Sequence, residues 1–143
     1  MFREADKKGI FLPSIEIQEH PQKGLICIAA SDIKSHELIE RCPTVKISCF
    51  AMEELSRLNG GRTNIHDYTF TRSVQGYSYW AMGYGGLYSH SSNPNAKWFI
   101  THQPNGRETI DIRSTKAISK GEEITVAYVR KEDEDILWFD AVE

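Results

Sequence analysis

The sequence has few cysteines, and the three that it has lie apart from one another. They are Cys27, Cys42 and Cys49, an odd number without a C-x-x-C pair. A disulfide framework or a zinc cage would need an even set or closely spaced pairs, so neither is indicated and no metal is expected. We expect buried structural thiols, because a free cysteine usually packs as a small apolar side chain.

Long apolar runs and an excess of positive charge are also lacking. No stretch approaches the roughly 20 apolar residues of a membrane helix, and the N-terminus has no apolar signal-peptide core. We therefore expect no membrane association, no secretion, and residence in the cytoplasm or the nucleus. The formal net charge of −3 argues against direct nucleic-acid binding, which usually needs a basic surface. It is compatible with a basic protein partner.

The residues that are present indicate one globular domain, from 143 residues with 40% hydrophobic and 26% charged content. Strand-like segments separated by Gly, Asn and Pro turns predominate; they lie at 10–12, 15–17, 23–30, 37–47 and at intervals between 68 and 128. Pro43 predicts that 37–47 is an edge strand. The pattern is that of a mainly β fold with one or two short helices.

One helix is predicted directly after residue 48. Ser48 can cap its N-terminus, and Met52, Leu55 and Leu58 recur at helical spacing. The run Asn59-Gly60-Gly61 then favours a C-terminal end, since glycine readily adopts the left-handed conformation that closes helices.

A seven-residue pattern occurs twice. Residues 33–39 and 118–124 both read Ile-x-x-(His or Gly)-Glu-x-Ile. Each places an apolar anchor, a tight turn and the start of a strand in the same order. One interpretation is a common β-turn that happens to recur. The other is two pseudo-equivalent hairpin units that face each other, as in β-clip folds.

Two further segments carry the clearest chemical signal. Residues 83–95 read Gly-Tyr-Gly-Gly-Leu-Tyr-Ser-His-Ser-Ser-Asn-Pro-Asn, and residues 121–128 read Gly-Glu-Glu-Ile-Thr-Val-Ala-Tyr. The first offers backbone groups and small polar side chains beside one imidazole, His90. The second is a turn glycine, two acids and a β-rich run that ends at Tyr128. Taken singly, His90 would be an ordinary turn histidine and Tyr128 a half-buried strand tyrosine.

Together with the strand entry at residues 24–28, these segments resemble, in order and spacing, the cofactor and active-site segments of the SET-domain protein lysine methyltransferases. The second matches the family's Asn-His-Ser-x-x-Pro-Asn with Ser89 in place of asparagine, and the third matches Gly-Glu-Glu-Leu/Ile-Thr-x-x-Tyr throughout. The first has Gly24-Leu25-Ile26 where the family usually has Gly-x-Gly. Residues 66–72 and 82–86 are most similar to short, stand-alone viral SET proteins.

The resemblance implies a SET-domain (β-clip) fold with a knot-like C-terminal threading that brings Ser89 and His90 near Tyr128. It implies a single domain over 1–143, with a core of roughly 23–128 and a C-terminal closing segment at 129–143. In that segment Trp138 or Phe139 would cover the cofactor while the surrounding acids attract a basic substrate. The plainer alternative for 129–143 is an acidic, solvated terminus.

The implied activity is S-adenosyl-L-methionine-dependent methylation of a lysine in a histone-like or other basic protein. Tyr128 is the implied catalytic residue, and the implied cofactor-binding residues are Gly24, Leu25, Ile26, Ser89, His90 and Tyr128. The candidate aromatic walls of the substrate channel are Tyr68, Tyr84 and Trp98, for each of which core packing is an equal alternative. So small a domain has reason to pair as a homodimer to complete its substrate groove.

The alternative function is a catalytically inactive SET or β-clip protein-binding module. Ile26 and Ser89, the two departures from the family pattern, would then be the positions at which activity was lost. Such a module is expected to have lost S-adenosyl-L-methionine binding together with turnover, so that a binding measurement separates the two functions.

Overall fold

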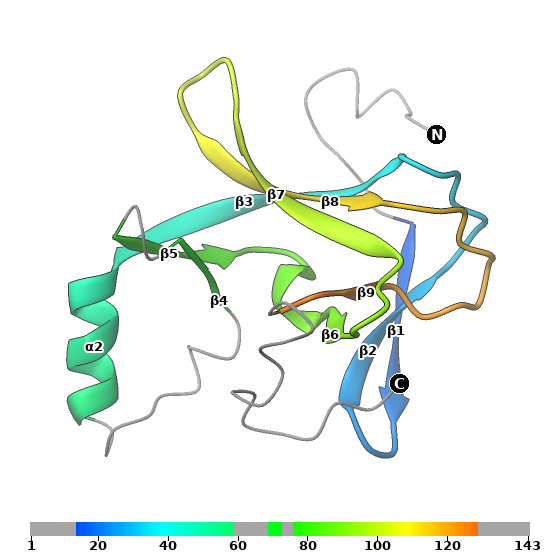
Figure 1. Cartoon of the computed structure of the whole chain (residues 1–143), viewed down its shortest axis with the longest axis horizontal. Helices are drawn as coiled ribbons and strands as arrows, with labels where there is room; N and C mark the ends of the chain where they lie inside the picture. Colours follow the sequence, from blue (N-terminus) through cyan, green and yellow to red (C-terminus); the bar gives the residue numbers. More distant parts are fainter. Residues whose placement is uncertain (1–13, 59–68, 73–75, 129–143) are drawn as a thin grey trace. The chain divides into compact units, whose positions relative to one another are not determined.

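The computed structural model describes residues 14–58, 69–72 and 76–128 of the chain (Figure 1). These residues fall into two compact units. Unit 1 comprises the described parts of Met1–Arg41, Leu87–Phe99 and Asp111–Glu143, and unit 2 those of Cys42–Gly86 and Ile100–Ile110. Within the described ranges, no helix is long and apolar enough to cross a membrane.

Strands make up most of the described elements. Unit 1 contains the strands β1 (Ile15–His20), β2 (Gly24–Ala29), β6 (Ser89–His90) and β9 (Thr125–Val126). Unit 2 contains β4 (Thr69–Arg72), β5 (Tyr77–Ala81) and the helix α2 (Cys49–Leu58). A 3-10 turn, η3 (Gly85–Leu87), precedes β6, and the longer strands β3 (Leu38–Ser48), β7 (Ala96–His102) and β8 (Glu108–Ser114) have residues in both units. This content confirms the mainly β class with a short helix.

The strands pair in three sheets. β1 and β2 form an antiparallel hairpin, β6 and β9 a parallel pair, and the remaining strands one sheet in the order β4-β5-β3-β8-β7. The prediction of an edge strand at 37–47 was therefore wrong, because β3 lies between β5 and β8. The β3–β5 register begins at Thr44↔Ala81, after Pro43. The Pro43 carbonyl accepts a hydrogen bond from the Met82 N–H at 2.8 Å, so the proline lies at the end of this ladder and contributes only its acceptor.

The predicted helix is present as α2. The Ser48 hydroxyl accepts a hydrogen bond from the Ala51 N–H at 3.1 Å, which satisfies one of the free donors at the helix start. Met52 is the buried residue of this helix, whereas Phe50 and Leu58 are exposed. The predicted terminating run, 59–61, lies outside the described residues.

The repeated pattern forms two turns of the same construction, which we call the first turn (residues 33–37) and the second turn (118–122). Their anchors, Ile33 and Ile118, are both buried. They pair in an antiparallel bridge with reciprocal N–H···O distances of 2.7 and 2.8 Å. At the equivalent fourth position, His36 has a φ of 61° and Gly121 a φ of 90°. The left-handed conformation is thus a shared requirement of both turns.

A glutamate closes each turn in the same way. In the first turn, the Glu37 carboxylate accepts a hydrogen bond from the Lys34 N–H at 2.7 Å. In the second, the Glu122 carboxylate accepts one from the Ser119 N–H at 2.9 Å. The equivalent bonds and the direct pairing of the anchors favour two pseudo-equivalent units over a chance recurrence of sequence.

The core of unit 1 consists mostly of β-branched side chains from segments far apart in the chain. Its fully or nearly fully buried apolar residues include Ile26, Cys27, Ile28, Ile33, Ile39, Tyr88, Ala96, Ile112, Ile118, Ile124 and Val126.

Two thiols were correctly expected to be buried, since Cys27 and Cys42 are free and 0% exposed. Cys49 is free and only partly buried.

Candidate active site

The two motif segments meet where β6 pairs with β9. The register joins Ser89 to Thr125 and His90 to Val126 in parallel, and Figure 1 shows the two strands side by side. The Ser91 N–H continues the pairing with a 3.0 Å bond to the Val126 carbonyl. This brings the Ser-His segment and the run ending at Tyr128 together, as the resemblance implied. The knot-like threading stays a prediction, because strand pairing alone does not define a thread.

The last residue of the Asn-Pro-Asn turn fastens this pairing. The Asn95 amide nitrogen donates to the Glu123 carbonyl at 2.8 Å, and its amide oxygen accepts from the Thr125 N–H at 2.9 Å. The side chain therefore acts as an additional rung beside β9. An asparagine is needed because only an amide offers a donor and an acceptor in this geometry. Asn95 was recognised as part of the motif, but this role was not predicted.

His90 orients the residue that ends the third segment. Its Nδ1 accepts a hydrogen bond from the Tyr128 N–H at 2.9 Å, and the two rings lie 5.4 Å apart at 53°. Since a backbone N–H can only donate, Nδ1 carries a lone pair, which places the proton of the neutral imidazole on Nε2. His90 is 3% exposed. Its imidazole is thus used to hold Tyr128, a role that the resemblance did not supply.

Tyr128 is anchored at two points although the residue is partly exposed. Its hydroxyl donates to the Tyr88 carbonyl, and its N–H is held by His90. The residue is nevertheless 40% exposed. A phenol that donates its proton to a carbonyl still has lone pairs with which to accept a hydrogen bond. The arrangement therefore fixes the phenol oxygen of a partly exposed residue, unlike a tyrosine that merely packs in a strand.

The glycine-bearing strand β2 is bonded to the third segment. The Ile124 N–H donates to the Cys27 carbonyl at 2.8 Å, and the Ala29 N–H donates to the Glu122 carbonyl at 2.9 Å. Beside these bonds, the Lys23 ammonium forms an ion pair with the Glu123 carboxylate at 2.8 Å, both side chains being largely buried. All three predicted segments are thus linked by hydrogen bonds within unit 1.

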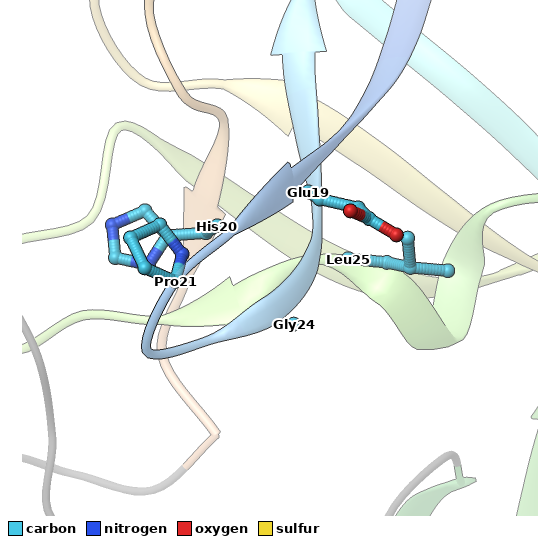
Figure 2. Close-up of a pocket in the computed structure, with 5 residues that line it drawn as sticks. All are labelled: Glu19, His20, Pro21, Gly24 and Leu25. Atoms are coloured by element: carbon cyan, nitrogen blue, oxygen red, sulfur yellow. The ribbon is translucent and has the colours of Figure 1, made fainter.

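A pocket of about 450 Å³ lies at the β1–β2 hairpin. Its lining residues are Glu19, His20, Pro21, Gly24 and Leu25 (Figure 2). In the view of Figure 2, the side chains of Glu19 and Leu25 lie on one side of the hairpin and those of His20 and Pro21 on the other. The volume is in the range of small-molecule sites, and two predicted cofactor residues, Gly24 and Leu25, contribute to it.

The three predicted residues of β2 differ in backbone conformation and in side-chain exposure. Gly24 has a φ of 84°, and no atom lies within 4 Å of an added Cβ, so its backbone conformation and not a lack of space calls for glycine. Leu25 is 50% exposed, whereas Ile26 is 6% exposed. The isoleucine that departs from the family pattern therefore directs its side chain into the core.

The predicted channel aromatics come from different parts of the chain, and their role stays a prediction. Trp98 lies on β7 in unit 1 and is partly buried. Tyr84 is a partly buried residue of unit 2. Tyr68 and the closing segment 129–143, with Trp138 and Phe139, lie outside the described residues. In the ranges that are described, no group of three His, Cys, Asp or Glu side chains is arranged to hold a metal.

Comparison with known proteins identifies the class. The SET domain model matches residues 24–129, so the chain belongs to the SET-domain family. Over 126 residues it is 28% identical to "Histone-lysine N-methyltransferase, H3 lysine-37 specific" of Schizosaccharomyces pombe (strain 972 / ATCC 24843), covering 88% of this chain and 77% of that protein.

A solved structure agrees with this assignment. The crystal structure of a Plasmodium falciparum protein described as a histone methyltransferase matches with a TM-score of 0.64 and 27% identity, covering 91% of this chain and all of that one. These findings confirm the SET-domain fold and the protein-lysine N-methyltransferase class that the three segments predicted. SET methyltransferases generally use S-adenosyl-L-methionine. The special similarity to viral SET proteins stays a prediction.

Proposed function

We propose that this protein transfers a methyl group from S-adenosyl-L-methionine to the ε-amine of a lysine in a histone-like or other basic protein. The observation that carries the proposal is Tyr128, whose hydroxyl and N–H are both fixed while the residue is 40% exposed. The relatives named above are described as histone methyltransferases, and the net charge of −3 suits a basic substrate. The cytoplasm or the nucleus is the proposed location.

The residues of unit 1 can supply what methyl transfer to an amine requires. S-adenosyl-L-methionine, when bound, provides the methyl group and a positive sulfonium that disfavours the charged form of a nearby lysine. Tyr128 would accept a hydrogen bond from the arriving amine and hold it for in-line attack. Neither a nucleophilic side chain nor a metal is needed for this reaction.

The residues that would hold the cofactor come from two of the predicted segments. Gly24 and Leu25 line the hairpin pocket, and Ile26, Ser89 and His90 would contribute backbone groups. The buried side chain of Ile26 is compatible with an active protein, because it packs in the core and does not line the hairpin pocket. The serine at 89 pairs with Thr125 through its backbone, which an asparagine or a serine can do equally well.

The number of methyl groups transferred is proposed to depend on Trp98. A bulky indole beside the amine would crowd a dimethylated lysine, while its face would hold the cation favourably. Trp98→Ala should therefore shift products towards higher methylation states. Pairing of two chains around the substrate groove remains part of the proposal.

The test combines transfer and binding. Purified protein is incubated with S-adenosyl-L-methionine that carries a deuterated methyl group, together with core histones or a lysate, and labelled lysines are mapped by mass spectrometry. Calorimetry measures cofactor binding in parallel, and Tyr128→Phe is the control for background labelling. Labelled lysines that require Tyr128 support the proposal. Absence of both binding and labelling would instead identify an inactive module.

A further inference from the structure

Tyr88 joins a buried carboxylate to the reactive tyrosine. Its hydroxyl donates to Glu40 Oε1 at 2.6 Å, and its carbonyl accepts the hydroxyl proton of Tyr128. Tyr88 stands between η3 and β6, whereas Glu40 comes from β3, 48 positions earlier in the chain. Tyr88 is thus bonded to Glu40 through its side chain and to Tyr128 through its backbone carbonyl.

Both members of the supporting pair are buried. Glu40 is 4% exposed and Tyr88 is 1% exposed. A carboxylate in such a place is destabilising unless hydrogen bonds replace its water, and a short bond from a phenol to a carboxylate is among the stronger ones. The bond therefore fixes the position of the Tyr88 ring in the core. The fixed ring in turn restricts movement of the attached backbone.

The carbonyl that receives the Tyr128 hydroxyl needs such a restraint. It precedes a strand of only two residues, β6, whose ladder begins at Ser89↔Thr125. The preceding peptide lies outside this ladder, so the bond of the buried Tyr88 side chain to Glu40 adds a restraint that the ladder does not supply. Rotation of that peptide would move the acceptor, and the Tyr128 phenol oxygen would move with it.

We propose that Glu40 is a positioning residue for methyl transfer, acting through the Tyr88 side chain to fix the carbonyl that orients the Tyr128 hydroxyl. The inference rests on the proposed function for its kinetic consequences. It assigns a role to two residues for which the sequence predicted none, Tyr88 directly before the Ser-His pair and Glu40 in β3.

The kinetic test uses a double-mutant comparison. Tyr88→Phe removes only the hydroxyl, and Glu40→Gln keeps the size but removes the charge and replaces one acceptor oxygen by an NH2 donor. Each should lower kcat by roughly tenfold, the scale of a slightly misplaced reacting group. The peptide KM and the cofactor Kd should change less than twofold. The two changes combined should be no worse than Tyr88→Phe alone, and neither should lower kcat further in a Tyr128→Phe background.

A matched control separates positioning from general stability. The Ser114 hydroxyl is 2% exposed and donates to the Lys34 carbonyl at 2.6 Å, so it is also a buried polar bond of unit 1, located at the first turn. Ser114→Ala should lower the unfolding temperature and leave kcat unchanged. An unchanged kcat in folded Tyr88→Phe and Glu40→Gln proteins would overturn the proposal. The proposal would also be overturned if either substitution lowered kcat by the same factor in a Tyr128→Phe background as in the unmodified protein.

A measurement without turnover keeps the inference independent of the proposed function. In protein labelled with ¹³C at the tyrosine ζ-carbon, the Tyr128 signal should shift in Glu40→Gln and stay in place in Ser114→Ala. If the wild-type protein methylates no substrate but this shift is seen, the positioning contact stands and the proposed function fails. If the signal does not move, the positioning role is rejected even in an active enzyme.

Discussion

The two turns of unit 1 are built alike and lead to opposite kinds of side chain. The first turn runs into β3 and delivers Glu40, which is 4% exposed. The second runs into β9 and, just beyond it, delivers Tyr128, which is 40% exposed. The same anchor, left-handed residue and glutamate thus precede a buried support in one case and a partly exposed tyrosine in the other. A turn of this kind fixes the backbone, while tertiary contacts decide the role of the side chains on the next strand.

The thiol of Cys27 on β2 is influenced by one carboxylate that follows each turn. Burial raises the pKa of its thiol to about 12, and the negative charges of Glu40 and Glu123 add to that effect. Glu40 follows the first turn and Glu123 the second. A neutral thiol is therefore the stable form beside these two carboxylates.

The largest effect on activity is expected at Tyr128, just beyond the strand β9 that follows the second turn. Tyr128→Phe keeps the ring and its contact with His90 but loses the hydroxyl, so methyl transfer should fall by about tenfold to a thousandfold. The unfolding temperature should change little. Single-turnover assays with thermal melts measure both quantities.

Tyr77→Phe is the matched control, because Tyr77 is another partly exposed tyrosine but belongs to unit 2. Its activity should equal that of the unmodified protein. Normal turnover by a folded Tyr128→Phe protein would show that the residue after the second turn has no special role in activity.

The next largest effect concerns the left-handed position that both turns share. Gly121→Ala should lower the free energy of unfolding by about 1–2 kcal/mol, because a Cβ is disfavoured at positive φ. No neighbour lies within 4 Å of the added carbon, so the cost is conformational. His36→Gly should have the opposite sign, a gain of about 0.5–1 kcal/mol, since it relieves the same strain at an exposed residue. Urea unfolding at pH 7 measures both.

This pair of substitutions tests whether the turns are equivalent. Opposite signs at His36 and Gly121 would establish that one backbone rule governs both. A loss of stability in His36→Gly would mean that the imidazole has a structural contact that sets the first turn apart.

A smaller effect is expected at alkaline pH. The thiol pKa of Cys27 is about 12 in the folded protein, against 9.0 for an unperturbed cysteine. A raised folded pKa means that the stabilisation is complete below pH 9 and is lost as the pH rises towards 12. Unfolding free energies of the unmodified protein should therefore fall relative to those of Cys27→Ala above pH 9. A constant difference between the two proteins from pH 7 to pH 10.5 would contradict this assignment.

The smallest effect is expected where the second turn's strand meets β6. Ser89 pairs with Thr125 through its backbone, so Ser89→Ala should weaken S-adenosyl-L-methionine binding only modestly, and Ser89→Asn should leave it unchanged or improve it. Calorimetric titration measures both changes. Abolished binding in Ser89→Asn would show that this segment is wrongly matched to the family's Asn-His pair.

Much of the fold and the position of the site followed from the sequence. Turn residues predicted the two equivalent turns, helical spacing with the Ser48 cap predicted α2, and three ordered motifs predicted the SET domain and its tyrosine. These features depend on residues a few positions apart, where φ preferences and side-chain-to-backbone bonds act locally. The one clear error, an edge strand at Pro43, arose because local chemistry does not say which strands lie on either side.

Tertiary structure alone decided how the site is held. Tyr128 is 38 positions from His90, Thr125 is 30 from Asn95, and Tyr88 is 48 from Glu40. No periodicity or turn rule links residues at such separations, because their contact depends on the path of the whole chain. The sequence therefore determined the SET family, and with it the tyrosine and the segments that we propose for the site. The folded chain determined that a buried imidazole, an amide and a carboxylate keep them in place.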